Sequence, residues 1–334
     1  MWVAVLVATA SVLWFAGCSD GRQPGEAAPP TAGSSGSPTL SATVAQTPSP
    51  SVASPVIRPQ PPAQDPRNGP WNRNLEIYRS ADGMTFSGAT VFVERAGVPC
   101  IIRDSSGRLV AVFQWFPFDN MAAFDRVAVA FSSDEGTTWT KPAMVEVSGM
   151  PANLMRPFDP TVVQLADGRF RLYFTSNSQG PGSEPAIYSA VSSDAVRFTF
   201  EDGVRFAPAG GTVDASVVLF GGQWHLFSHN QRANTGVGFH AASSDGLTFQ
   251  QLADVDIGTG RQWIGNALVT GGTLRYFGSG QGGVWSASSA DGAKWTLDTG
   301  VRAAGGDASA VVLGDGQVLL AVVGELRPDA GPVP

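Results

Sequence analysis

Short runs of alternating apolar and polar residues fill the chain from about residue 75 to its C-terminal end. One of them reads Arg169-Phe170-Arg171-Leu172-Tyr173-Phe174 and directly follows the turn residues Asp167-Gly168. Alternation with a period of two over such lengths is typical of β-strands with one buried face. No part of this region shows the spacing of an amphipathic helix. The pattern therefore predicts an all-β fold.

A Ser-x-Asp turn recurs five times between these strands, with an alternating apolar run before it and an aromatic residue after it. The copies contain Asp82, Asp134, Asp194, Asp245 and Asp291, spaced 52, 60, 51 and 46 residues apart. An Asp side chain can accept hydrogen bonds from backbone N–H groups a few residues further on. Glycine allows the positive φ of a tight hairpin. We therefore expect these aspartates to shape turns rather than to take part in catalysis.

A second repeat lies between the Ser-x-Asp turns and reads as an apolar strand, a tight turn and an alternating strand. The aligned first residues of its five copies are Val98, Asp159, Asp214, Asn266 and Asp307. Together the two repeats supply four strands per unit, and repeats of this length are typical of propeller blades.

The first and last strands of this region lack partners within their own repeats. The region opens with one strand-turn-strand, residues 75–94, and closes with one strand pair, residues 307–323. We expect these two halves to form the last blade together. The prediction for residues 71–334 is thus an all-β, five-bladed β-propeller with four antiparallel strands per blade. A two-sheet sandwich with accidental repeats is the alternative.

The N-terminal residues predict export. An apolar run from Trp2 to Phe15 is followed by Ala16-Gly17-Cys18, which resembles a bacterial lipoprotein signal. No Lys or Arg precedes this run, so an ordinary secretory signal is the alternative. We predict a signal peptide over residues 1–17, a lipid on Cys18 that anchors the protein to a membrane of the cell envelope, and a Pro/Ser/Thr-rich disordered tether over residues 18–70.

Composition narrows the possible partners. The net charge of −7 disfavours nucleic acid, which needs a basic surface. The second cysteine, Cys100, lies in an apolar run and reads as a buried, inert thiol. The sequence contains no zinc pattern, phosphate loop or dinucleotide fingerprint. We therefore predict no cofactor and no metal, and we expect a monomer.

The aligned first residues of the inner strands are the candidate functional residues. In a propeller these strands begin around the central tunnel, so Asp159, Asp214 and Asp307 are expected to converge at one mouth. They could pin the ring, bind a ligand or cation, or act in catalysis. Glycoside hydrolysis uses one protonated and one ionised carboxyl group, and crowding of like charges can raise one pKa to that end.

The run from Arg156 to Phe174 resembles the blade-start motif of five-bladed glycosidases, namely glycoside hydrolase family 43 and the invertase and levansucrase groups. The resemblance implies a glycan substrate and catalysis by Asp159 and Asp214, whereas Asp307 could take part only if the geometry were rearranged. By position Asp159 corresponds to the pKa-tuning Asp and Asp214 stands in the place of the acid. Val98 occupies the position of the base, which departs from the pattern of these enzymes.

The turn around Asp134 matches the Asp-box motif of sialidases, so an exo-sialidase-like hydrolase is another alternative. That activity would need an arginine cluster, for which Arg103, Arg156 and Arg261 are candidates, and a phenol such as Tyr276.

We predict an envelope-anchored, glycosidase-like propeller that acts on or binds a glycan at the tunnel mouth. A non-catalytic propeller that binds a protein or carbohydrate partner is the alternative. Aromatic residues with polar neighbours suit sugars. The predicted substrate-binding residues are Trp115, Arg156, Glu184, His229, Arg261, Trp263 and Asn266.

Overall fold

The computed structural model describes residues 66–180, 182–230 and 236–333. The predicted signal peptide, Cys18 and most of the predicted tether lie outside the described residues. Residues 66–70, which the sequence assigned to the tether, instead belong with two short 3-10 helices, η1 (Pro66–Asn68) and η2 (Pro70–Asn72). The described part contains no helix long and apolar enough to cross a membrane.

The predicted all-β fold is confirmed, because strands make up nearly all of the regular structure. The strands form antiparallel meanders, numbered here 1 to 5. Meander 1 contains β3 (Ala96–Arg103), β4 (Leu109–Trp115), β5 (Arg126–Ser132) and β6 (Ala143–Met144). Meander 2 contains β8 (Phe158–Gln164), β9 (Phe170–Ser176), β10 (Ala186–Ser192) and β11 (Arg197–Phe206), with β7 (Glu146–Ser148) parallel to β11. Meander 3 contains β12 (Val213–Phe220), β13 (Gln223–His229), β14 (Val237–Ser243) and β15 (Gln250–Gln251), with β16 (Val255–Asp256) paired to β14.

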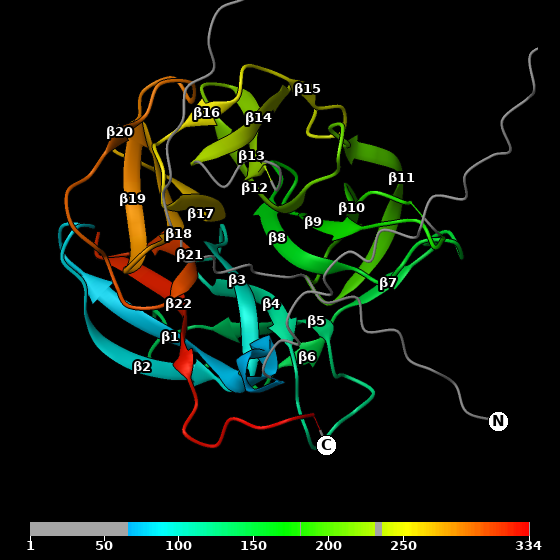
Figure 1. Ribbon diagram of the computed structural model, residues 1–334, viewed down its shortest axis with the longest axis horizontal. Coiled ribbons are helices and arrows are strands. Elements are labelled where there is room, and N and C mark those ends of the chain that lie inside the picture. The colour runs from blue at the N-terminus through cyan, green and yellow to red at the C-terminus, as the bar shows by residue number, and fades with distance from the viewer. Residues whose placement is uncertain (1–65, 181, 231–235, 334) are drawn as a thin grey trace, which may run out of the picture. The chain divides into compact units, whose positions relative to one another are not determined.

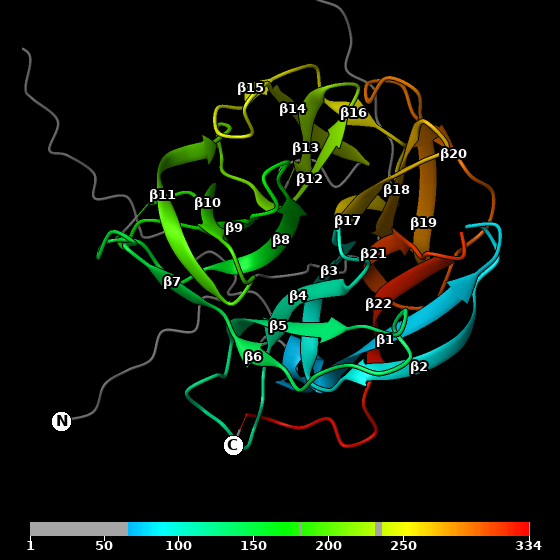
Figure 2. The same ribbon diagram turned by 180° about the vertical axis from the view of Figure 1, so that it is seen from behind.

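The last two meanders share an eight-stranded sheet. Meander 4 contains β17 (Arg261–Thr270), β18 (Thr273–Gly280), β19 (Gly283–Ser289) and β20 (Thr296–Leu297). Meander 5 contains β21 (Gly306–Val312), β22 (Val318–Leu326), β1 (Arg73–Ser80) and β2 (Ser87–Val93). A single parallel bridge between Gly265 and Ala308 joins the two. Figures 1 and 2 show the meanders side by side around a common centre, with the first strand of each nearest to it.

Meander 5 is built from both ends of this region, as the sequence predicts. Strand β1 pairs antiparallel with β22 along its length, from Arg73 opposite Leu326 to Ser80 opposite Val318. Beyond the strands, the side chains of Trp71 and Asn72 both donate hydrogen bonds to the carbonyl oxygen of Gly331. Strands from the two ends of this region thus form one sheet.

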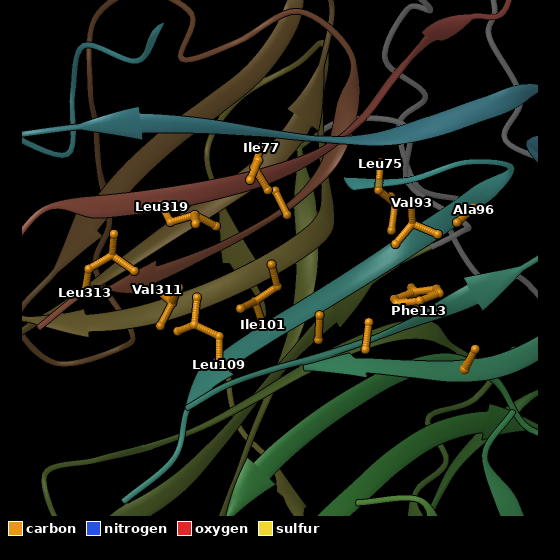
Figure 3. Close-up of a cluster of buried hydrophobic side chains, with 14 residues drawn as sticks. Leu75, Ile77, Val93, Ala96, Ile101, Leu109, Phe113, Val311, Leu313 and Leu319 are labelled. Atoms are coloured by element: carbon orange, nitrogen blue, oxygen red, sulfur yellow. The ribbon is translucent and has the colours of Figure 1, made fainter. Parts of the chain in front are cut away.

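The apolar core is divided into clusters between successive meanders. Meanders 5 and 1 share the cluster in Figure 3, and similar clusters lie between meanders 1 and 2, 2 and 3, 3 and 4, and 4 and 5. The labelled side chains of Figure 3 come from β1, β2, β3, β4, β21 and β22 and from Leu313, the residue after β21. Every meander therefore buries one sheet face against each of two neighbours, as strands of alternating pattern require.

The Ser-x-Asp turns have the geometry that the sequence predicts. In the first, Asp82 Oδ1 accepts hydrogen bonds from the backbone N–H groups of Met84 and Thr85, both at 2.8 Å, and from the hydroxyl of Ser80. The copies at Asp194, Asp245 and Asp291 repeat this bonding. In the copy at Asp134, Oδ1 accepts one backbone N–H, that of Thr138, and the hydroxyl of Ser132. These hydrogen bonds hold the pKa of Asp82 well below its ordinary value. A carboxylate fixed in this way stabilises the turn.

Candidate functional site

Three aspartates and a valine line one cavity at the centre of the meanders. Asp159, Asp214 and Asp307 stand near the starts of β8, β12 and β21, and Val98 holds the same place in β3. The cavity measures about 10 Å³, which is room for roughly one water molecule. The rest of its lining is Pro160, Thr161, Ala215, Gly265 and Asn266.

A β-bulge turns each of these side chains toward the centre. The register of β3, β8, β12 and β21 shifts by one residue at this point. The bulged residues have φ of 50° at Val98, 50° at Asp159, 54° at Asp214 and 49° at Asp307. Aspartate enters this left-handed region more readily than other non-glycine residues, whereas a β-branched valine is an outlier there. The four positions share one strained geometry, and Val98 has it without a carboxyl group.

Burial in this cluster makes ionisation of the acids unfavourable. It raises the pKa of Asp159 to about 6 and that of Asp307 to about 7, with the charge of Asp159 adding to the effect on Asp307. The pKa of Asp214 also lies well above its usual range, through burial and the charges of the other two acids. The side chain of Thr175 and, after it, the backbone N–H of Asp214 lower the pKa of Asp159. The backbone N–H of Val98 lowers the pKa of Asp307. The cluster therefore retains protons near neutral pH.

Beneath the acids, small polar side chains link four of the five pairs of neighbouring meanders. Ser309 Oγ accepts the N–H of Ile101 at 3.0 Å, and Ser216 Oγ accepts that of Ala267 at 2.8 Å. The equivalent side chains in β3 and β8 are Cys100, whose Sγ accepts the N–H of Val162, and Thr161, whose hydroxyl donates to Ala215 O. Burial raises the pKa of the Cys100 thiol to about 11, which agrees with the expected inert thiol.

Asn266 lines the cavity together with the acids, as expected, but it belongs to this lower level. Counted from the hairpin turn, it pairs with Phe277 as Ser216 pairs with Phe227. The bulge of β17 contains one residue more than the others. The side-chain amide of Asn266 donates to Pro99 O, in β3, at 3.1 Å. It therefore closes the floor of the cavity rather than facing its mouth.

A second set of residues, polar except for Val323, flanks the bulges, and only His229 among them was predicted from the sequence. In each meander one residue of the second strand pairs with the residue just before the bulge. These are Gln114, Thr175, His229, Ser279 and Val323. The sequence signal for this set is a polar residue at the end of an apolar second strand. These residues align only when the second strands of the meanders are compared with each other.

Several atoms of this second set are buried without a hydrogen-bond partner among the described residues. They are Gln114 Oε1, Thr175 Oγ1 and His229 Nδ1, and Asp159 Oδ2 shares this property. They belong to meanders 1, 2 and 3, at the end of the strands where the cavity lies. Buried polar atoms in native proteins nearly always have a partner. This end of the molecule therefore offers unmet hydrogen-bonding capacity next to the acids.

Arg156 and Trp115 lie at the same end of meanders 1 and 2. Arg156 forms an ion pair with Asp125, whose other oxygen accepts a hydrogen bond of 2.8 Å from Gln114 Nε2. The charge of Asp159 also acts on Arg156. Trp115 is half-buried and packs in part against the core. Both residues stay in the candidate site.

Burial lowers the pKa of His229 to about 4, so this imidazole is neutral near pH 7. The carboxylate of Glu184 accepts the N–H of Gly210 at 2.7 Å, and Arg261 donates to the backbone oxygens of Ile257 and Thr259. These contacts fix the loops that carry both residues.

The expected stacking role of Trp263 is wrong. Its side chain is 0% exposed and its Nε1 donates to Gly236 O at 2.9 Å. The ring packs among Phe227, Tyr276, Trp285 and Trp295. Gly238 makes room for it, since a Cβ there would lie 2.4 Å from the indole ring. Trp263 is a core residue because its ring, on β17, points between meanders 3 and 4.

The residues that a sialidase would need do not come together. Arg103 lies at the hairpin end of β3 and pairs with Glu135, whereas Arg156 pairs with Asp125 at the other end. Tyr276 is fully buried and its hydroxyl donates to Gly265 O at 2.8 Å. The sialidase alternative therefore gains no support from these positions.

Two further observations concern metal ligands and a second cavity. Among the described residues, no group of three or more Asp, Glu, His or Cys side chains is placed to hold a metal ion. A second cavity, of about 380 Å³, lies between β1, β2 and the turn that carries Trp139. It contains none of the predicted site residues.

Comparison with known proteins supports the fold and no closer relationship. No protein-family model and no curated protein matches the sequence. Among solved structures, a thermostable family-43 glycoside hydrolase aligns with 72% of this chain and 95% of its own, at 13% identity and a TM-score of 0.51. An α-L-arabinofuranosidase from Lactobacillus brevis aligns with 67% of this chain and 82% of its own, at 14% identity and a TM-score of 0.50.

A GH32 β-fructofuranosidase from Bombyx mori aligns with 76% of this chain, at 15% identity and a TM-score of 0.50. The aligned part spans 57% of the length of that enzyme. At these identities the similarity shows a fold shared with propeller glycoside hydrolases.

Proposed function

We propose that this protein is a five-bladed β-propeller that binds a glycan at the mouth of its central tunnel. The five meanders, each packed against two neighbours, support the blade count. One observation carries the binding proposal. Three carboxyl groups and a set of buried, unpartnered polar atoms lie at the same end of the molecule. Sugars present many hydroxyl groups, which are both donors and acceptors and can satisfy such atoms.

Binding without hydrolysis agrees best with the geometry. A cavity of about 10 Å³ leaves no room for a sugar ring between the carboxyl groups. Hydrolysis requires two carboxyl groups on either side of the scissile bond. The position that would carry the base holds Val98. The backbone N–H groups of Asp214 and Val98 also engage two of the acids, which supports a role in holding the ring.

Glycoside hydrolysis remains a second candidate because of the pKa values of the acids. Values of about 6 for Asp159 and about 7 for Asp307 would let one group be protonated while another is ionised near neutral pH. An acid and a base of this kind are what general acid–base catalysis uses.

A glycan array probed with the full chain tests the proposal. The double variant Asp159→Asn, Asp214→Asn serves as the site knockout, and Asp119→Asn, which removes one exposed carboxylate, serves as a control. We expect selective binding by the wild type and the control, and at least tenfold weaker binding by the double variant. Binding that the double variant retains in full would overturn the proposed site. Released sugar in the same samples would favour the hydrolase.

We also propose that the protein is exported and anchored to a membrane of the cell envelope through a lipid on Cys18. The apolar run before Ala16-Gly17-Cys18 supports this proposal. Labelling of the full chain with a fatty acid in a bacterial host tests it. Wild type should carry the label and Cys18→Ala should not. Equal labelling of both, through the remaining Cys100, would overturn the assignment.

A further inference from the structure

The cavity between the three acids has the size of a single small polar group. Its volume of about 10 Å³ corresponds to roughly one water molecule. A primary ammonium group is of similar size. No Lys or Arg side chain lines the cavity within the described residues, and the nearby Arg156 is already paired with Asp125. Among the described residues, the cavity thus has three carboxyl groups and no cation of its own.

The hydrogen-bonding character of the cavity is also one-sided. Ionised carboxylates only accept hydrogen bonds, whereas an ammonium group only donates them and has three N–H bonds. Asp159 is 6% exposed, lines the cavity and has an Oδ2 atom without a partner. The hydroxyl of the fully buried Thr175 lies beside this carboxyl group and lowers its pKa. A donor-rich, positively charged group would satisfy these atoms.

We propose that the glycan recognised here is an amino sugar, whose primary ammonium group enters the cavity between Asp159, Asp214 and Asp307. This inference rests on the proposed glycan-binding function and adds the chemical class of the ligand. The sugar ring remains outside the cavity, at the tunnel mouth, where Trp115 and Arg156 lie. Neutral sugars lack the charge, and acidic sugars are repelled by the carboxylates.

The raised pKa values of the acids support the same ligand. Without a cation, burial and mutual repulsion keep protons on the cluster. A bound ammonium group supplies the positive charge instead, because opposite charges within a few ångströms favour the ionised form. Binding is therefore expected to release protons from the carboxyl groups to solvent.

Isothermal titration of the full chain with a glucosamine tetramer and with the matched N-acetylglucosamine tetramer tests the inference. The two ligands differ only in the acetyl groups that remove the charge. At pH 6.5 we expect the glucosamine tetramer to bind at least tenfold more tightly. Titration in two buffers of different ionisation enthalpy should show proton release. Asp159→Asn and, as a second variant, Asp307→Asn should reduce the preference to less than threefold, while Asp119→Asn keeps it.

The outcomes separate the inference from the function on which it rests. Equal affinity for the two tetramers would overturn the amino-sugar assignment and leave glycan binding intact. Binding of neither tetramer, together with a silent glycan array, would overturn both. A lysine-containing peptide provides the ammonium group from another source. Binding of that peptide without binding of the tetramer would overturn the amino sugar in favour of a protein partner.

Discussion

Asp307 belongs to the candidate site, and ionisation of its buried carboxyl group lowers the stability of the folded protein. Its pKa of about 7 in the folded protein exceeds the ordinary value of 3.8, mainly because the group is buried. The folded state therefore holds this proton more tightly than the unfolded chain does. The stability that protonation contributes is fully present near pH 4 and is lost as the pH rises through about 7.

Asp307→Asn should consequently stabilise the protein at alkaline pH. An amide can still accept the backbone N–H of Val98, but it never ionises. Relative to wild type, we expect a gain of about 1 kcal/mol or more at pH 8 and little gain at pH 4. Urea unfolding at both pH values measures the difference. A variant less stable than wild type at pH 8 would mean that the carboxylate stabilises the ring.

Trp263 and Trp115 give a contrast between a core and a mouth residue of the same type. Trp263→Ala removes a fully buried ring and its hydrogen bond to Gly236, so we expect a loss of about 3 to 5 kcal/mol. Trp115→Ala removes a half-buried ring and should cost less stability. It should weaken glycan binding instead. Unfolding and glycan binding are to be measured on both variants. A larger loss of stability in Trp115→Ala than in Trp263→Ala, with the larger loss of binding in Trp263→Ala, would contradict this assignment.

At the scale of the strands, a pair of buried histidines makes meander 3 sensitive to acid. His225 Nδ1 and His240 Nε2 lie 3.0 Å apart, and one hydrogen links them. His240 Nδ1 has no partner among the described residues. A second proton would therefore either disrupt the link or leave a buried N–H without an acceptor. Burial accordingly lowers the pKa of both residues, for His240 to about 4, although Asp291 nearby opposes the shift.

The pH dependence follows from the ordinary histidine pKa of about 6.5. The contribution of the neutral histidine pair to the free energy of unfolding is fully present above pH 6.5 and is lost as the pH falls toward 4. His240→Phe should retain the stacking on Phe227 and remove part of this loss. Between pH 7 and 4.5, wild type should lose on the order of 1 kcal/mol more stability than the variant. Equal losses in urea unfolding would show that the pair does not titrate on unfolding.

The strands also show which parts of the fold and site the sequence could predict. Alternating residues and Ser-x-Asp turns revealed the four-strand repeat, because each turn uses a local hydrogen bond. The three acids could be aligned because their bulges have equal length. The level of Asn266 was missed, because its distance from the hairpin turn matches that of Ser216 and not that of Asp214. The burial of Trp263 depends on contacts between two meanders, which no local pattern contains.

At the scale of the whole propeller, the join between the two ends of the described region should decide cooperative stability. Asn72 is fully buried and bonds to both the carbonyl and the N–H of Gly331. Asn72→Ala leaves the N–H of Gly331 unpaired and its carbonyl with the hydrogen bond from Trp71 alone, and should cost about 1 to 3 kcal/mol. The exposed Asn68→Ala, four residues earlier, serves as the matched control and should change stability by less than about 0.5 kcal/mol.

Hydrogen exchange on the Asn72 variant would separate a global effect from a local one. Every meander packs on two neighbours, and β1 pairs with β22 along its whole length. If the join supports the whole ring, protection should fall in β8 and β12 as well as in β1 and β22. Faster exchange confined to β1 and β22 would contradict this prediction. It would mean that the other meanders hold together without the closing pair, as stacked repeats do when each contacts only its neighbours.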